Sequence, residues 1–257
     1  MLPISDDPGP RRRFPIINYL LIAANIAVFV AEIANGPCFQ AEFSVVPHAI
    51  VTGTSATFTE CAITQPTPVY VTLFTAMFLH ANLLHIGGNM LYLWIFGWIF
   101  GDNVEDRLGH VGYLVFYLFC GLVASAAQIA VGPDSTIPNL GASGAIAGVL
   151  GAYLVFYPGA RVRTLVWLGF FITFARLSAV IVIGLWFVLQ LVSGLASLNQ
   201  GAFSSDGGIA YFAHIGGFAA GFVIALLLRP VLRVPKRYNT TYPSWPAHPD
   251  WRDYSYR

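Results

Sequence analysis

The stretch NLGASGAIAGVLGAYLVFYP, residues 139–158, is apolar enough to cross a membrane, yet it places one hydroxyl, that of Ser143, among small residues near its start. A polar side chain in hydrocarbon is costly unless it faces a cavity or meets a partner. Ser143 is therefore the first candidate for a functional group. The rest of the sequence indicates which side chains could lie beside it.

The composition is that of an integral membrane protein. Of 257 residues, 56% are hydrophobic and only 10% are charged, and the mean hydropathy is +0.67. About a quarter of the residues in a soluble domain are charged. We therefore expect a lipid bilayer to surround the chain, and we expect no nucleic-acid partner.

Apolar runs long enough to form helices lie at about 15–34, 83–100, 110–131, 142–157, 177–195 and 209–228. A helix needs roughly 20 apolar residues to span a bilayer, so these runs predict an all-α protein with six transmembrane helices. The twelve residues TLVWLGFFITFA, 164–175, are too few for a seventh crossing. An interfacial or re-entrant segment is the expectation there.

The distribution of cations predicts that both termini are cytoplasmic. Loops at about 35–78, 132–140 and 196–208 contain no Lys or Arg, whereas cytoplasmic loops are normally enriched in them. The expected organisation is a cytosolic segment 1–14, a six-helix domain 15–229 and a cytosolic tail 230–257, with no cleaved signal peptide. The cytoplasmic pieces would hold Arg11, Arg12, Arg13, Arg107, Arg161, Arg163, Arg176, Arg229, Arg233, Lys236, Arg237, Arg252 and Arg257, which are all thirteen Lys and Arg.

Two of the three cysteines, Cys38 and Cys61, fall in the same predicted outer loop. Oxidation is permitted outside the cytoplasm, so a disulfide between them is one hypothesis and a pair of free thiols is the other. Cys120 lies inside the third predicted span and is interpreted as a small buried apolar residue.

Four polar side chains inside predicted spans are taken as functional candidates: His85 and Asn89 in the second, Ser143 in the fourth and His214 in the sixth. At about 1.5 Å per residue, Ser143, His214 and His85 each lie about 22–24 Å from the inner end of their helix. Asn89 shares the face of His85 because residues four apart align on a helix. The four side chains are therefore predicted to occupy one region of the membrane.

Glycine spacing favours close approach of the fourth and sixth spans. Small residues four apart form ridges along which membrane helices pack until their backbones touch. Ser143 and His214 each border such a ridge, so packing of the two helices would bring hydroxyl and imidazole together. The ridge glycines are Gly144 and Gly148 in the fourth span and Gly217 and Gly221 in the sixth.

These side chains allow other interpretations. A lone serine in a membrane helix usually bonds its own helix backbone, and a metal site built from His80, His85 and His214 is a further alternative. The sequence contains no His-Glu-x-x-His motif, and GASGA differs from the Gly-x-Ser-x-Gly elbow because Ala145 replaces its second glycine. His80 is expected only to orient a loop. No role is predicted for His48, His110 and His248.

The motifs HANLLHIGGN, GDNVEDRLGH, GASGA and AHIGGFAAG together resemble those of the rhomboid intramembrane serine proteases, from the first span to about Arg229. The resemblance implies that Ser143 is the nucleophile and His214 the general base of a dyad that lacks an aspartate. It also implies that His85, Asn89 and the backbone N–H of Ser143 form the oxyanion hole. No cofactor or metal is expected.

The sequence departs from the family pattern at two points. An aromatic residue often follows the serine by four positions in the family, whereas this chain has Ala147, and the Trp-Arg pair of the first outer loop is missing. Residues 197–208 resemble the loop that caps the site in rhomboids. The implied partners are single-pass membrane-protein substrates and lipid, and oligomerisation is not required. A bacterial plasma membrane is the expected location, with the site open to the outer face.

Two further functions stay open. A catalytically silent rhomboid-like protein could bind transmembrane helices as an adaptor, although silent relatives typically lack the serine, the histidine or both. A transporter is favoured less, because no inverted repeat or charged pathway is evident in the sequence.

Overall fold

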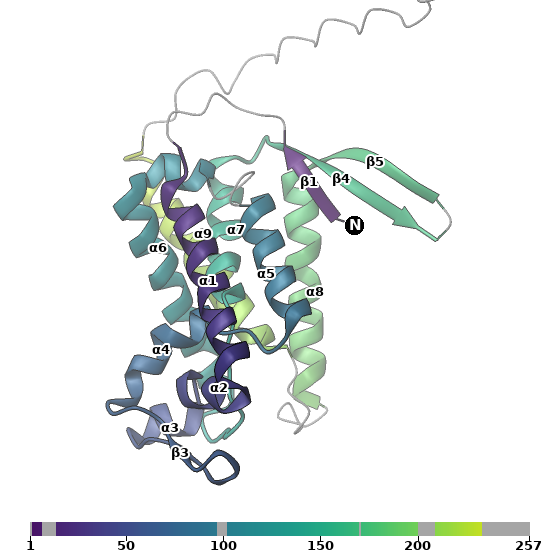
Figure 1. Ribbon diagram of the computed structural model, residues 1–257. Helices are drawn as coiled ribbons and strands as arrows, with labels where there is room; N and C mark the ends of the chain where they lie inside the picture. The colour runs from purple at the N-terminus through teal and green to yellow at the C-terminus, as the bar shows by residue number, and fades with distance from the viewer. Residues whose placement is uncertain (1, 7–13, 97–101, 170, 200–208, 233–257) are drawn as a thin grey trace, which may run out of the picture.

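A computed structural model describes residues 2–6, 14–96, 102–169, 171–199 and 209–232 of the chain. Most of this part is helical, and the long helices stand side by side as a bundle (Figure 1). Each of the six predicted runs overlaps one helix. They are α1 (Ile16–Asn35), α5 (Leu83–Phe96), α6 (Asp102–Val131), α7 (Ser143–Phe156), α8 (Ala179–Asn199) and α9 (Tyr211–Leu228).

Four helices in the described part are long and apolar enough to cross a membrane: α1, α6, α8 and α9. A fifth crossing results if α5 is counted together with the short helices that precede it, which meet it at a 75° bend. These short helices are η2 (Val69–Val71), α4 (Thr72–Thr75) and η3 (Ala76–Phe78). The predicted number of six spans is therefore met in part, and the predicted loop 35–78 is folded at its end.

Helix α7 has only 14 residues, which is about 21 Å of helix and less than a bilayer needs. It is the central helix of the fold, because nearly all of its side chains are buried, among them Tyr153. Tyr117 of α6 is also fully buried. Since neighbouring helices enclose it, α7 can begin inside the bundle, and Ser143 at its first position is thereby placed below the end of the bundle.

A glycine interrupts α6 near the start of the third predicted span. Gly109 has a φ of 72°, a left-handed conformation that glycine adopts without steric cost, and it separates the short beginning of α6 from the long part that follows. The predicted start of this span at residue 110 agrees with that break.

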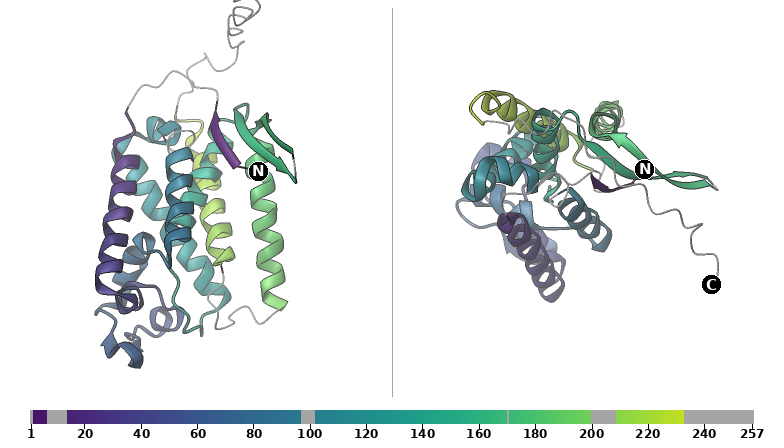
Figure 2. Two further views of the ribbon diagram at one scale, coloured as in Figure 1. Left: turned by 45° about the vertical axis from the view of Figure 1, so that its right-hand side comes forward. Right: turned by 90° about the horizontal axis from the view of Figure 1, so that it is seen from above.

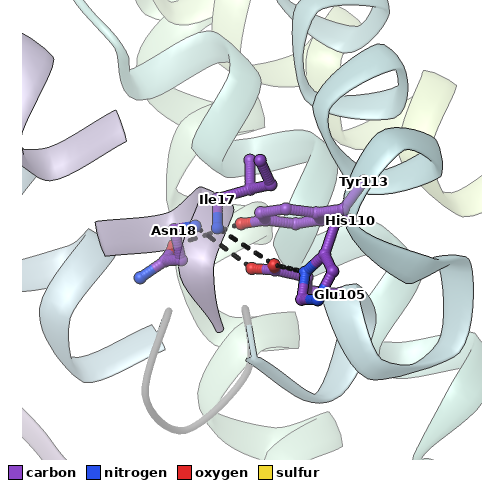
Figure 3. A network of polar contacts seen from close by, with 5 residues as sticks. All are labelled: Ile17, Asn18, Glu105, His110 and Tyr113. Carbon is purple, nitrogen blue, oxygen red and sulfur yellow. Dashed lines mark hydrogen bonds and ion pairs between the residues drawn. The ribbon is translucent and has the colours of Figure 1, made fainter. Parts of the chain in front are cut away.

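Buried Glu105 fastens the beginning of α1 to α6 (Figure 3). Its carboxylate accepts hydrogen bonds from the backbone N–H groups of Ile17 (3.0 Å) and Asn18 (3.1 Å), and it lies 2.5 Å from Nδ1 of His110. The hydroxyl of Tyr113 donates to the side-chain oxygen of Asn18. The first N–H groups of a helix lack intrahelical partners, so this carboxylate supplies what α1 needs at its N-terminus.

The predicted outer loop contains its own small structure at one end of the bundle. It includes α2 (Pro37–Phe43), α3 (Pro47–Thr52), the 3₁₀ turn η1 (Thr59–Cys61) and a two-stranded ribbon of β2 (Thr57–Phe58) and β3 (Ile63–Thr64). A disulfide joins Cys38 of α2 to Cys61, with the two Cα atoms 5.5 Å apart. Cys120 is free and buried.

The opposite end of the bundle carries a three-stranded antiparallel sheet, with the order β1 (Leu2–Asp6), β4 (Arg161–Leu168) and β5 (Phe171–Ser178). The prediction of an all-α fold is therefore wrong in this region. The segment 164–175, for which an interfacial or re-entrant position is predicted, forms most of the hairpin of β4 and β5. The hairpin of β4 and β5 extends sideways beyond the helices (Figure 2). Within the predicted N-terminal segment, residues 2–6 form β1, which pairs with β4.

The sequence of β4 explains why it is a strand. Val162, Thr164 and Val166 are buried, Arg163 and Trp167 are exposed, and Leu165 is half-buried. An alternation of period two is the pattern of a strand with one covered face, and it is lost when hydropathy is averaged over a window. Gly169, with a φ of 62°, lies in the connection between the two strands.

Candidate active site

Ser143 is presented by a loop that other elements hold in place. Val45 and Asn139 exchange two backbone hydrogen bonds, of 2.9 and 2.7 Å. The N–H of Gly141 donates to the carbonyl oxygen of Ala76, at 2.8 Å. These contacts fix the direction in which the chain enters α7, so that the hydroxyl of Ser143 has a defined position.

The structure brings Ser143 and His214 into direct contact. Nε2 of His214 on α9 lies 2.7 Å from Oγ of Ser143, a hydrogen-bond distance, although 71 residues separate the two in sequence. Both side chains are partly buried. A hydroxyl that donates to an imidazole at this distance is the arrangement of a serine nucleophile and its base.

Close packing of α7 and α9 makes the contact possible. A Cβ on Gly217 would overlap the backbone oxygen of Gly144, and one on Gly221 would overlap the backbone oxygen of Gly148. Gly151, which the sequence analysis did not single out, packs in the same way against the backbone oxygen of Phe218. The two helices approach until their backbones touch, as such glycine ridges allow.

Two side chains of α8 hold the imidazole of His214. Nδ1 of His214 lies 2.8 Å from Oε1 of Gln190. The ring of Trp186 packs on it with centroids 5.9 Å apart and planes at 34°. Ala147, at the position where the resemblance leads one to expect an aromatic residue, is buried on α7. The aromatic contact with His214 is thus supplied by Trp186.

Gln190 and Trp186 were missed as site residues in the sequence analysis. Gln190 is a polar side chain inside the fifth predicted span, 177–195, and it met the same criterion as the four side chains that were chosen. Trp186 precedes it by four residues, so both lie on one face of the helix. Glu32, inside the first predicted span, also met this criterion and was not chosen. Its carboxylate accepts a hydrogen bond from the backbone N–H of His80.

His85 and Asn89 of α5 lie beside the loop that leads to Ser143. A Cβ on Gly141 would lie 2.8 Å from Nε2 of His85 and 3.7 Å from Nδ2 of Asn89. Gly141 also has a φ of 129°, which only glycine adopts readily. This glycine therefore leaves room for both side chains just before the start of α7.

The hydrogen-bonding groups of this pair are poised to donate. Nδ1 of His85 lies 3.4 Å from the backbone N–H of Ala81 and accepts from it, which leaves the proton of a neutral imidazole on Nε2. Asn89 is buried, and its Nδ2 has no hydrogen-bond partner among the described residues. Buried donors are normally paired, so an unpaired amide in this position is unusual.

One cavity unites the four predicted side chains. It has a volume of about 540 Å³, and its apolar walls come mainly from α5, α7 and the segment just before α7, whereas α8 contributes Trp186. A smaller cavity of about 40 Å³ on the other side of Ser143 is bordered by Ser125, Gln128 and Asn139. The residues that bring hydroxyl, imidazole or amide groups to the large cavity are Asn82, His85, Asn89, Tyr92, Asn139, Ser143 and His214.

None of the remaining histidines in the described part of the chain forms a hydrogen bond with the four predicted side chains. His80 is fully buried, its ring 5.2 Å from that of His85, and neither ring nitrogen has a partner within the described residues. Within the described residues, no three His, Cys, Asp or Glu side chains are arranged so that they could hold a metal ion. The alternative of a metal site built from His80, His85 and His214 is therefore not supported. His110 binds Glu105, and His48 is the second residue of α3. His248 and most of the predicted cap loop 197–208 lie outside the described residues.

Comparison with known proteins agrees with the motifs. A family model described as "Rhomboid domain" matches residues 68–231. The chain is 28% identical over 164 residues to "Rhomboid-like protein 11, chloroplastic" of Arabidopsis thaliana, which covers 63% of this chain and 53% of the relative. It is 33% identical over 156 residues to "Rhomboid protease GluP" of Bacillus subtilis (strain 168), covering 61% of this chain and 25% of the relative.

A third relative is "Rhomboid protein 1, mitochondrial" of Saccharomyces cerevisiae (strain ATCC 204508 / S288c), 26% identical over 155 residues, with 59% of this chain and 40% of the relative covered. The matched regions thus span about half or less of the length of these relatives. The relatives come from a plant, a bacterium and a yeast, so they do not single out one kind of membrane.

Proposed function

The chain belongs to the rhomboid family, and on that premise we propose that it is an intramembrane serine protease. The observation that carries the proposal is the 2.7 Å contact between Oγ of Ser143 and Nε2 of His214 inside a cavity. Family membership alone does not decide activity, because relatives include both a named protease and proteins named only rhomboid-like.

In the proposed reaction, Oγ of Ser143 attacks the carbonyl carbon of a substrate peptide bond while Nε2 of His214 takes its proton. The imidazolium then protonates the leaving amine as the carbon–nitrogen bond breaks, and an acyl-enzyme ester remains. Water, deprotonated by His214, hydrolyses the ester and restores Ser143. The small cavity next to Ser143, which Ser125 and Gln128 border, is large enough to hold a water molecule.

Negative charge on the carbonyl oxygen needs donors that are already in place. The proposed donors are Nδ2 of Asn89, Nε2 of His85 and the backbone N–H of Ser143. Ser143 is the first residue of α7, where N–H groups lack intrahelical partners and the helix dipole favours negative charge. The free amide of Asn89 and the tautomer of His85 support this assignment.

The proposed substrates are segments of single-pass membrane proteins. The cavity wall includes Leu84, Ile146, Leu150 and Trp186, which favour an apolar peptide. Only an unwound stretch of substrate could present its backbone to Ser143, because the peptide bonds of a helix are shielded by their own side chains and hydrogen bonds. The six-span topology and the opening of the site toward the outer face remain part of this proposal.

The decisive experiment is cleavage of a panel of single-span substrates by purified full-length protein in detergent. Ser143→Ala and His214→Ala should each reduce cleavage to background, and the double variant should be no slower, since residues that act as a unit are not additive. A fluorophosphonate should attach to Ser143 in the wild type. Ser193→Ala on α8, outside both cavities, is the matched serine control and should cleave normally.

Two results would contradict the proposal. Cleavage by folded Ser143→Ala protein would exclude the serine nucleophile. Binding of transmembrane segments by the wild type without cleavage or fluorophosphonate labelling would instead favour the silent adaptor.

A further inference from the structure

Gln190 on α8 stands in the position that a third catalytic-triad member occupies in other serine hydrolases. Its Oε1 lies 2.8 Å from Nδ1 of His214, while Nε2 of the same ring lies 2.7 Å from Oγ of Ser143. The three side chains come from three helices, α8, α9 and α7. They form a continuous chain of hydrogen bonds from amide through imidazole to hydroxyl.

The direction of these bonds follows from the chemistry of a neutral imidazole, which carries one proton on one of its two nitrogens. A hydroxyl can donate to Nε2 only if Nε2 is bare, so the proton must sit on Nδ1. The side-chain oxygen of Gln190 accepts that N–H. An apolar side chain at position 190 would leave the N–H of Nδ1 without a partner. The tautomer with no proton on Nε2 would then no longer be favoured over the other tautomer.

The position of Gln190 also carries a free-energy cost. Helix α8 is the least covered of the four long apolar helices, with only 17% of its apolar window buried. An amide in such a helix is costly unless it finds a partner inside the bundle. The imidazole of His214 is the side-chain partner that the structure gives it.

We propose that Gln190 is a positioning residue of the dyad, which holds His214 in the tautomer and orientation that accept the proton of Ser143. The inference rests on the proposed function, and it extends the Ser-His dyad of this chain to a Ser-His-Gln arrangement. Trp186 covers the face of the ring, and Gln190 fixes rotation of the ring in its own plane. Asn plays the equivalent part beside the catalytic histidine of papain-like proteases.

The test compares two substitutions in the full-length protein. Gln190→Met keeps the length and flexibility of the side chain but removes the hydrogen-bond acceptor. The value of kcat should therefore fall about 10- to 100-fold with KM nearly unchanged, which is less than the full contribution of a general base. Gln190→Glu keeps an oxygen that accepts from Nδ1 and should recover most of the lost kcat. Leu189→Met, one residue away on the exposed face of α8, is the control and should match the wild type.

A second measurement does not depend on activity. Nitrogen NMR of histidine-labelled protein distinguishes the Nδ1–H and Nε2–H tautomers, and the signal of His214 is identified by its loss in His214→Ala. At a pH where the ring is neutral, the wild type should show the Nδ1–H form. Gln190→Met should show a mixture of the two forms, and Gln190→Glu should restore the first.

An unchanged kcat and an unchanged tautomer in Gln190→Met would overturn the inference, as would a Gln190→Glu variant that is as slow as Gln190→Met. If the wild type itself neither cleaves substrates nor reacts with fluorophosphonate, the proposed function fails. The tautomer measurement still decides, in that case, whether Gln190 fixes the imidazole of His214.

Discussion

At the scale of single residues, the hydrogen-bond partners of two histidines in the site favour opposite tautomers. His214 meets Gln190 through Nδ1, so its Nε2 is free to accept from Ser143. His85 accepts the N–H of Ala81 through Nδ1, so its Nε2 can donate. One imidazole is thus arranged as a base and the other as a hydrogen-bond donor, and the difference comes from the group bound at each Nδ1.

The amide of Asn89 gives the first prediction at this scale. Asn89→Ala should lower kcat about 100- to 1,000-fold while KM changes little, because an oxyanion donor acts in the transition state and hardly in the ground state. His85→Ala should have a similar or smaller effect. Steady-state kinetics with a single-span substrate measures both.

Asn35→Ala serves as the matched control, since Asn35 is an exposed asparagine at the end of α1 that bonds only its own helix. It should leave kcat and KM unaltered. A rise in KM at constant kcat for Asn89→Ala would mean that the amide binds substrate in the ground state, and the oxyanion assignment would then be abandoned.

The candidate site residues could be predicted from sequence because polarity stands out inside an apolar run. Ser143, His214, His85 and Asn89 were found in this way, and the structure places all four around one cavity. Their mutual distances could not be predicted, since they depend on how α7 and α9 pack. Gln190 could have been predicted in the same way, because it is polar and lies in an apolar run. The role of Trp186 could not, because an aromatic residue in a span normally packs against other side chains or faces lipid.

At the scale of elements, the helices followed from hydropathy and the sheet did not. A helix of about 20 apolar residues gives a strong average over a window, so the boundaries of α1, α8 and α9 were predicted to within a few residues. The strands β4 and β5 are short and carry Arg161, Arg163 and Arg176 among apolar residues. Pairing with β1, which is remote in sequence, also stabilises them and leaves no local signal.

The contact between α7 and α9 leads to a prediction about one glycine. Gly221→Ala should destabilise the protein by about 1–3 kcal/mol or more, because the added methyl overlaps backbone atoms of Gly148 that cannot move without separating the helices. Cleavage activity should fall with it, since the distance between Ser143 and His214 depends on the same packing. Thermal unfolding in detergent and a cleavage assay measure the two effects.

Gly184→Ala on α8 is the control for that substitution. Nothing lies within 4 Å of a Cβ built there, so the added methyl should be neutral or slightly stabilising through its helix propensity. An equally stable Gly221→Ala protein would show that α7 and α9 are less closely packed than the structure indicates.

At the scale of the whole molecule, the two ends of the bundle differ in chemistry. One end carries the sheet of β1, β4 and β5, to which Arg161, Arg163 and Arg176 belong (Figure 1). The other end carries α2, α3 and β3, in a segment that contains no Lys or Arg and includes the disulfide of Cys38 and Cys61. Cations are retained on the cytoplasmic side and disulfides persist outside it. Both features therefore predict the same orientation.

That orientation can be tested with two single substitutions in exposed positions at opposite ends, Thr54→Cys before β2 and Thr173→Cys on β5. A membrane-impermeant maleimide added to intact spheroplasts should label Thr54→Cys, whereas Thr173→Cys should react only after the membrane is opened. The parent protein is a sound control, because Cys38 and Cys61 are bonded and Cys120 is buried. Labelling of Thr173→Cys alone in closed spheroplasts would invert the orientation, and labelling of both would mean that the two ends of the bundle do not lie on opposite sides of the membrane.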